Sequence, residues 1–232
     1  MPRSLDKDTR FMLGPEYLDG RQHLMALVAE AIARWSSVEH LFGNLLARIF
    51  HTSPVAAVEM YLGISQHSQA QALNSAAASA LNDPVHVKLF QAVRALADRC
   101  GQERHKLAHH LFGVATAEDA IVLADPKDIL KFDVRTYAWT LEVKSGKPKT
   151  TAFKVLNKSA VELYDEADLK RLNERVDRVR TYIVRLWLIL EPDNADSNRE
   201  TAALLAEPEI AAELKQRASG GGRRSRRKKA AS

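Results

Sequence analysis

One feature constrains the fold more than any other: over residues 22–50 the hydrophobic residues recur at steps of three and four. The recurring positions are Leu24, Val28, Ala31, Trp35, Val38, Phe42, Leu45 and Ile49. An α-helix has about 3.6 residues per turn, so this spacing places all of them on one face of a single long helix. Because such a stripe has to be covered by other elements, we expect a helical bundle.

Prolines and capping residues mark where the other helices begin and end. Ser53-Pro54 and Asp83-Pro84 each join a capping residue to a proline at the first helical position. Asp165 precedes a third long apolar stripe, and Gly113 is expected to close the helix that Asp83-Pro84 opens. Pro208 falls near the middle of a short alanine-rich pattern. The expected helices cover residues 54–62, 67–81, 85–111, 166–190 and, for the short pattern, 201–216.

Between residues 120 and 157 the pattern changes to short β-rich runs separated by turn residues. Asp125-Pro126 and Ser145-Gly146 lie between these runs, which are 120–124, 131–143 and 150–156. They predict a small antiparallel β insertion. The expected fold is therefore mainly α. Its expected parts are an irregular lead-in at 1–21, a helical bundle with the β insertion at 22–192, a peripheral helix at 193–218 and a disordered basic tail at 219–232.

The basic character of the chain comes from its last residues. The net charge is +5, but six cations and no acid stand near the C-terminus, and without those six the net charge is −1. They are Arg223, Arg224, Arg226, Arg227, Lys228 and Lys229. Such a tail can bind RNA, DNA or an acidic partner through counterion release. The other interpretation is that the tail only increases solubility and has no specific role.

The apolar runs, the N-terminal residues and the cysteine count indicate where in the cell the protein is found. No apolar run is long enough to span a membrane, and the charged N-terminal residues lack the apolar stretch of a secretory signal. Cys100 is the one cysteine, so it forms no internal disulfide, and its place on an apolar helical stripe predicts a buried residue. We expect a cytoplasmic protein without a membrane association.

The segment that carries chemistry is 103–113, with the sequence Glu-Arg-His-Lys-Leu-Ala-His-His-Leu-Phe-Gly. Cleavage of RNA by its own 2′-hydroxyl needs a base, an acid and a cation for the extra charge on the phosphate. Histidine titrates near working pH and can act as base or acid. The guanidinium of arginine suits phosphate oxygens. Arg104 and His109 supply these groups without a metal, so they are the predicted catalytic pair.

This segment resembles the motif of the HEPN superfamily, in which an arginine, usually an asparagine, a few residues and a histidine stand within a phrase such as Arg-Asn-x-Leu-Ala-His-Gly-Leu-Trp. The resemblance implies a helical bundle, usually a homodimer, with metal-independent endoribonuclease activity. It also implies a role in toxin–antitoxin or defence systems, with an antitoxin-like protein as a partner. His105 replaces the usual asparagine, and we treat it as an accessory residue. His110 and Phe112 replace the frequent glycine and tryptophan.

The geometry of a straight helix separates the two catalytic candidates. At about 100° per residue, Arg104 and His109 lie about 140° apart, so they do not share a face. Arg104 falls at the edge of the apolar stripe, where a charge is costly to bury unless it is paired. Glu39 has the matching place on the first long helix. We therefore expect a buried or half-buried ion pair between Glu39 and Arg104, and a structural role for Arg104 stays open.

Several alternatives remain. His105 and His109, one helical turn apart, could supply half of a zinc site, but no third ligand is evident nearby, so neither a metal nor a cofactor is expected. The chain could also be a catalytically inactive HEPN-like scaffold, which the near-neutral body favours. A nucleic-acid binder that acts through its tail is the third reading.

Overall fold

The computed structural model describes residues 2–5, 9–127, 161–191 and 193–229, with residues 220–229 described by their backbone alone. The chain divides into two compact units. The sheet unit comprises residues 1–29 and 105–171, and the helical unit comprises residues 30–104 and 172–232. The long helices α1 (Gln22–Phe50), α4 (Pro84–His109) and α6 (Glu166–Ile189) each contribute residues to both units.

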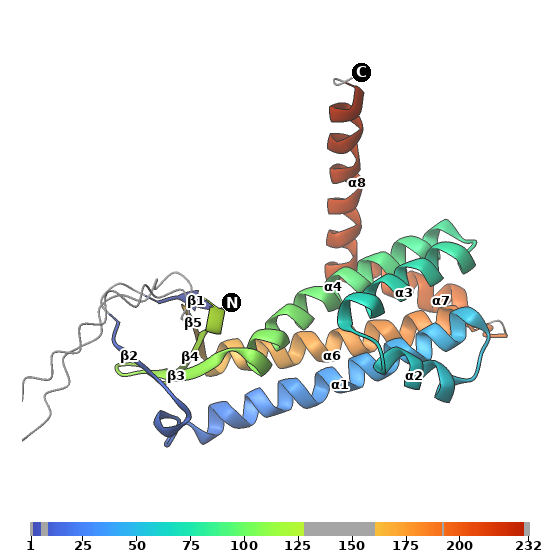
Figure 1. The fold of residues 1–232 in the computed structure, drawn as a ribbon. Helices are drawn as coiled ribbons and strands as arrows, with labels where there is room; N and C mark the ends of the chain where they lie inside the picture. Colours follow the sequence, from blue (N-terminus) through green and yellow to red (C-terminus); the bar gives the residue numbers. More distant parts are fainter. Residues whose placement is uncertain (1, 6–8, 128–160, 192, 230–232) are drawn as a thin grey trace, which may run out of the picture. The chain divides into compact units, whose positions relative to one another are not determined.

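The helical unit packs α1, α4 and α6 alongside one another (Figure 1). Its other helices are α2 (Pro54–Leu62), α3 (Gln66–Ala80), α7 (Ser197–Ala206) and α8 (Pro208–Lys229). The helices predicted at 22–50, 54–62 and 166–190 are confirmed, and α3 begins and ends within one residue of its prediction. The prediction of a mainly helical fold is thus confirmed for the described residues.

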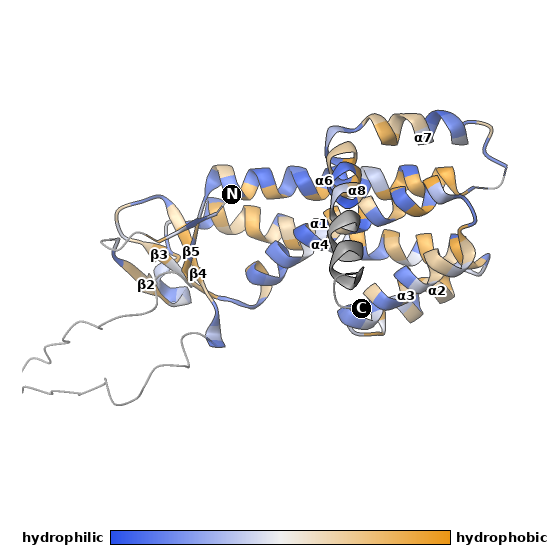
Figure 2. Ribbon diagram, turned by 90° about the horizontal axis from the view of Figure 1, so that it is seen from above, coloured by the Kyte–Doolittle hydropathy of each residue, from blue (hydrophilic) through white to orange (hydrophobic). Residues whose placement is uncertain are grey.

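The apolar stripes read from the sequence form the core of the helical unit. Figure 2 shows hydrophobic residues alternating with hydrophilic ones along α1, α4 and α6. The buried members include Trp35, Val38, Phe42, Leu45, Leu89, Val93, Cys100, Val176, Val179, Ile183 and Leu186. Burial of Cys100 confirms that prediction. Removal of these side chains from water is the main force that holds the bundle together.

Two glycines let other helices approach α1 closely. A Cβ atom at Gly101 would lie 2.9 Å from the ring of Trp35, and one at Gly43 would lie 2.9 Å from the Cα atom of Val58. Such distances are shorter than real Cβ contacts, so even alanine would force a shift at either position. Gly101 therefore fits α4 against the indole on α1, and Gly43 admits the backbone of α2.

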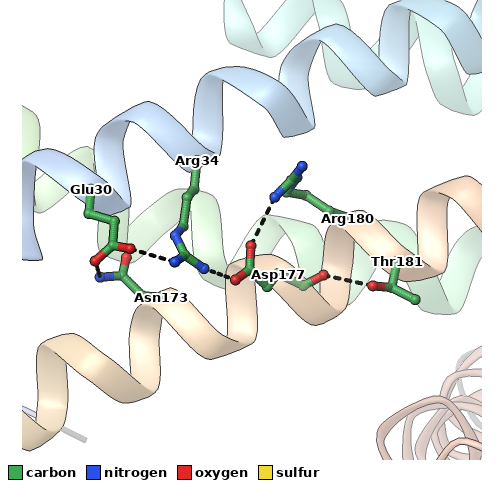
Figure 3. A network of polar contacts seen from close by, with 6 residues as sticks. All are labelled: Glu30, Arg34, Asn173, Asp177, Arg180 and Thr181. Carbon is green, nitrogen blue, oxygen red and sulfur yellow. Dashed lines mark hydrogen bonds and ion pairs between the residues drawn. The ribbon is translucent and has the colours of Figure 1, made fainter.

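Polar side chains also tie α1 to α6 (Figure 3). Arg34 on α1 forms ion pairs with Glu30 and with Asp177 on α6. Asn173 Nδ2 donates to Glu30 Oε2 over 3.2 Å, and Arg180 lies 3.0 Å from Asp177. The periodicity of the apolar residues gives no sign of this network, because it lies beside the stripes.

Pro208 begins a helix instead of interrupting one. The short helix predicted at 201–216 is wrong in this respect: α7 ends at Ala206, and α8 starts at Pro208. Glu207 between them is extended, with φ −63° and ψ 125°. The residue before a proline is biased toward such a conformation, and the ring of proline is preorganised for the first helical position.

The sheet unit contains a five-stranded sheet with the order β1-β5-β4-β3-β2, and all neighbouring strands are antiparallel. The strands are β1 (Arg3–Ser4), β2 (Phe11–Leu13), β3 (Leu111–Ala115), β4 (Ala120–Ala124) and β5 (Val161–Asp165). Every residue of β4 is buried. The strand predicted at 120–124 and a small antiparallel sheet are therefore confirmed, but β1, β2, β3 and β5 lie outside the insertion predicted at 120–157.

Two sequence-based boundaries differ from the structure. The lead-in at 1–21 is not wholly irregular, since it supplies β1 and β2 and a short 3-10 helix, Pro15–Tyr17. The helix predicted at 85–111 ends at His109, and Leu111 already belongs to β3. Gly113 is therefore no helix cap. A Cβ atom there would overlap the carbonyl oxygen of Met12 on β2, so glycine is needed where the two strands pair.

Some predictions concern parts of the chain that the structure covers only partly. The strands expected at 131–143 and 150–156 lie outside the described residues. The tail at 219–232 is expected to be disordered, but the backbone of α8 is helical through Lys229. Arginine and lysine are good helix formers, and positive charge favours the C-terminal end of a helix. In the described parts of the chain, no helix has both the length and the hydrophobicity to cross a membrane.

Candidate functional site

The predicted catalytic segment lies at the end of α4, where the chain leaves the helix for β3. The amide of His110 donates to the carbonyl of Lys106 over 2.9 Å, so the helical turn is regular up to this point. Leu107 is buried and anchors the turn in the core. His105 and His109 flank it and are both exposed. The turn thus holds two imidazoles at the surface on a fixed backbone.

His105 and His109 contact each other. Their ring centroids lie 4.5 Å apart, and the ring planes are tilted by 50°. Residues four apart on a helix are neighbours on its surface, which accounts for the contact. The residue that replaces the usual asparagine of the motif is therefore positioned against the predicted catalytic histidine.

Strand β5 places polar groups beside this turn. Lys106 Nζ lies 2.7 Å from Glu162 Oε1, and the hydroxyl of Tyr164 donates to Glu162 Oε2 over 3.1 Å. Burial lowers the pKa of His110, whereas the nearby Asp125 and Glu162 carboxylates act in the opposite sense. Glu162 is thus a further candidate for the site, which the sequence does not predict because nothing in it pairs β5 with the end of α4.

Arg104 is half-buried on the same helix, within the helical unit. Its Nε atom is buried and has no hydrogen-bond partner. The expected ion pair with Glu39 is absent from the described residues. Glu39 Oε1 instead accepts a hydrogen bond of 2.9 Å from Trp35 Nε1, one turn earlier on α1. This local partner satisfies the carboxylate, so the prediction of a Glu39–Arg104 ion pair is wrong.

Arg94, not Arg104, is the cation that meets this part of α1. Its guanidinium lies 5.4 Å from the ring centre of Phe42, and it forms an ion pair of 2.7 Å with Asp98. Burial raises the pKa of Tyr61 to about 12, with Arg94 opposing the rise and Glu39 adding to it. The positive charge expected at Arg104 is therefore supplied by Arg94, ten residues earlier on α4, which is nearly three helical turns.

The arginines of the helical unit are otherwise almost all neutralised. Ion pairs to carboxylates are formed by Arg34, Arg48, Arg94, Arg99, Arg178, Arg180, Arg185, Arg199 and Arg217. Among the side chains described in this unit, Arg104 and Arg175 are the two arginines outside these pairs, and the Nε atom of each is buried without a hydrogen-bond partner. Arg104 thus forms no ion pair with a carboxylate of the described residues.

The two catalytic candidates belong to different units. The boundary falls between Arg104 and His105, so Arg104 is assigned to the helical unit and His109 to the sheet unit. Both residues lie on the continuous helix α4, five residues apart.

Two open pockets lie elsewhere, between α1 and α6 of the helical unit. Their volumes are about 550 and 750 Å³, and both include Leu41 and Val184. The cations in their walls are already engaged: Arg48 pairs with Glu191 and lies 4.7 Å from the ring centre of Trp187. None of the predicted site residues lines either pocket. These two pockets therefore do not coincide with the predicted catalytic residues.

Two further predictions concern the tail and metals. The cations of the tail, Arg223 to Lys229, lie on α8 beyond the last described side chain. Over the described residues, no group of three or more His, Cys, Asp or Glu side chains is arranged to hold a metal ion.

Comparison with known proteins gives no relative: no family model, no curated protein and no solved structure matches the chain significantly. The similarity to the HEPN superfamily therefore rests on the residues of segment 103–113.

Proposed function

We propose that the chain is a metal-independent endoribonuclease of the HEPN type, in which Arg104 and His109 act on a phosphodiester of RNA. The observation that supports this most is that the last turns of α4 contain an exposed histidine and an arginine outside the ion pairs. His109 is exposed, and Arg104 is half-buried and forms no ion pair with a carboxylate of the described residues. Most other arginines of the helical unit are engaged in ion pairs.

Each residue has one task in the proposed reaction. The substrate's 2′-hydroxyl attacks the neighbouring phosphorus, and an imidazole accepts its proton. The guanidinium of Arg104 stabilises the charge that develops on the non-bridging oxygens. A second imidazole donates a proton to the leaving 5′-oxygen. The products are a 2′,3′-cyclic phosphate and a free 5′-hydroxyl.

The second imidazole is best supplied by a second copy of the chain. The attacking and leaving oxygens lie on opposite sides of phosphorus in this reaction. His105 and His109 contact each other on one face of α4, so together they do not bracket a phosphate. A homodimer in which two copies of α4 face one cleft provides histidines on both sides, as the resemblance implies.

The test is incubation of the purified chain with single-stranded and stem-loop RNA in EDTA. The proposal predicts cleavage with 2′,3′-cyclic phosphate ends, identified by mass spectrometry. RNA that stays intact with and without divalent metal would refute the proposal.

A second candidate function is an inactive HEPN-like interaction module. It is favoured by the open α1–α6 pockets, which share the apolar residues Leu41 and Val184. The arginines Arg48 and Arg185 that line these pockets form ion pairs with carboxylates. Substitution of Val184 by Asp would then abolish a protein–protein contact without affecting RNA. Under the ribonuclease proposal, the same substitution leaves the chemistry of Arg104 and His109 in place.

A further inference from the structure

The contact between His105 and His109 has a use beyond proton transfer. Two exposed imidazoles one turn apart, with centroids at 4.5 Å, can direct one ring nitrogen each toward a common point. Histidines spaced in this way on one helix face provide two of the ligands in helical zinc sites. The regular turn between them, fixed by the His110-to-Lys106 hydrogen bond and by buried Leu107, means that little order has to be gained on binding.

We infer that His105 and His109 chelate one divalent transition-metal ion, with Zn²⁺ as the natural probe, at the exposed end of α4. Imidazole nitrogen suits zinc, copper and nickel, whereas magnesium and calcium prefer oxygen ligands. No third protein ligand is arranged there among the described residues, so water completes the coordination. The site is thus an open one with exchangeable positions.

The charges around the turn are compatible with a bound cation. Lys106 is the nearest positive side chain in sequence, and Glu162 holds its ammonium at 2.7 Å. The carboxylates of Asp125 and Glu162 both act on neighbouring His110, so negative charge lies close to the end of the helix. These groups offset the repulsion that a second positive charge would meet.

The inference goes beyond the proposed function, and it does not require it, because metal binding is measured without RNA. If both hold, the ion occupies the imidazole of His109 that the proposed reaction uses. Zinc would then inhibit cleavage, and EDTA would leave it unchanged or raise it.

The experiment is titration of the untagged full chain with ZnCl₂ by isothermal calorimetry, alongside His105→Ala, His109→Ala and His67→Ala. His67 is the matched control, because it is also exposed on a helix but hydrogen-bonds to Gln71 and has no second imidazole one turn away. Circular dichroism establishes that each variant is folded. Loss of an exposed histidine is expected to leave the fold intact.

The inference predicts one site in the wild-type chain and in His67→Ala. Each of the other two variants should bind zinc at least about tenfold more weakly, since loss of even an outer-shell partner has effects of this size. A variant with both His105→Ala and His109→Ala should bind zinc about as weakly as the weaker of the two single variants, because one imidazole alone makes no chelate. MgCl₂ should not compete. Wild-type affinity in His105→Ala or in His109→Ala would overturn the inference.

Discussion

Polar side chains have different roles in the two units. In the helical unit, arginines and carboxylates join helices to one another, as Arg34 on α1 does with Asp177 on α6. In the sheet unit, the last turn of α4 exposes His105 and His109, which contact each other. An ion pair between helices is explained by its part in the fold. The exposed imidazoles of His105 and His109 join no two elements, although a histidine suits the C-terminal end of a helix.

The largest effect should follow from removal of an imidazole that the fold does not need. His109→Ala is expected to lower the rate of RNA cleavage about 10²–10⁴-fold, the usual contribution of general acid–base catalysis. The unfolding free energy should change by less than about 0.5 kcal/mol, as for other exposed positions. Cleavage is followed on labelled RNA in EDTA. A loss of the same size in the exposed-histidine control His67→Ala would break the comparison.

His105→Ala sharpens this prediction. A large loss of rate would mean that His105 has taken the role of the asparagine that it replaces. A small loss would make it a bystander in the reaction, which leaves its contact with His109 available for metal binding.

The basic tail is a third region, and it contains no acid to neutralise its six cations. Deletion of residues 219–232 should remove most salt-sensitive binding to nucleic acid. With about 0.7 counterions released per cation on a single strand, the slope of log affinity against log salt should fall by about 4. The slope is measured by fluorescence anisotropy between low and physiological salt. An unchanged slope would mean that the body of the protein contains a basic surface of its own.

A smaller effect, on stability alone, is expected for the ion pairs of α8. Glu213 is buried and binds Arg99 at 2.8 Å and Arg217 at 3.0 Å. Glu213→Gln should lower the unfolding free energy by about 1.5–3 kcal/mol, the value of hydrogen bonds to charged groups. The control Glu59→Gln removes a carboxylate that is exposed on α2. Urea denaturation compares the two, and equal effects would contradict a structural role for Glu213.

The same carboxylate predicts a dependence on pH. Burial by itself would raise the pKa of Glu213, but the bonds to Arg99 and Arg217 outweigh burial and lower it below 4.5. A lowered folded-state pKa stabilises the fold above the unfolded value, and this contribution is lost as the pH falls through the folded value. Stability should therefore decline below about pH 4.5, and less steeply in Glu213→Gln. Parallel acid profiles for the two proteins would rule out this contribution.

The sequence predicts the helices well because their spacing is a local property. The apolar stripe of α1 and the proline-marked start of α2 suffice to place both helices. The prediction fails where a partner from elsewhere in the chain decides. Gly113 looks like a helix cap, but it lies on β3 opposite Leu13, where a Cβ atom would overlap the carbonyl oxygen of Met12 on β2. Arg104 looks like the partner of Glu39, but Trp35 satisfies that carboxylate locally. His109 could be chosen from sequence, whereas Glu162 and Arg175 depend on packing that no spacing reveals.

The central claim is that the charge of Arg104 is available for a substrate, whereas the charge of Arg34 is used by the fold. The most direct measurement compares Arg104→Met with Arg34→Met, since methionine keeps most of the aliphatic stem. Arg34→Met should lower the unfolding free energy by about 1–3 kcal/mol and leave cleavage per folded molecule unchanged. Arg104→Met should stay within about 0.5 kcal/mol of the wild type and abolish cleavage. If Arg104→Met destabilises the fold as much as Arg34→Met, or cleaves RNA at the wild-type rate, the claim is contradicted.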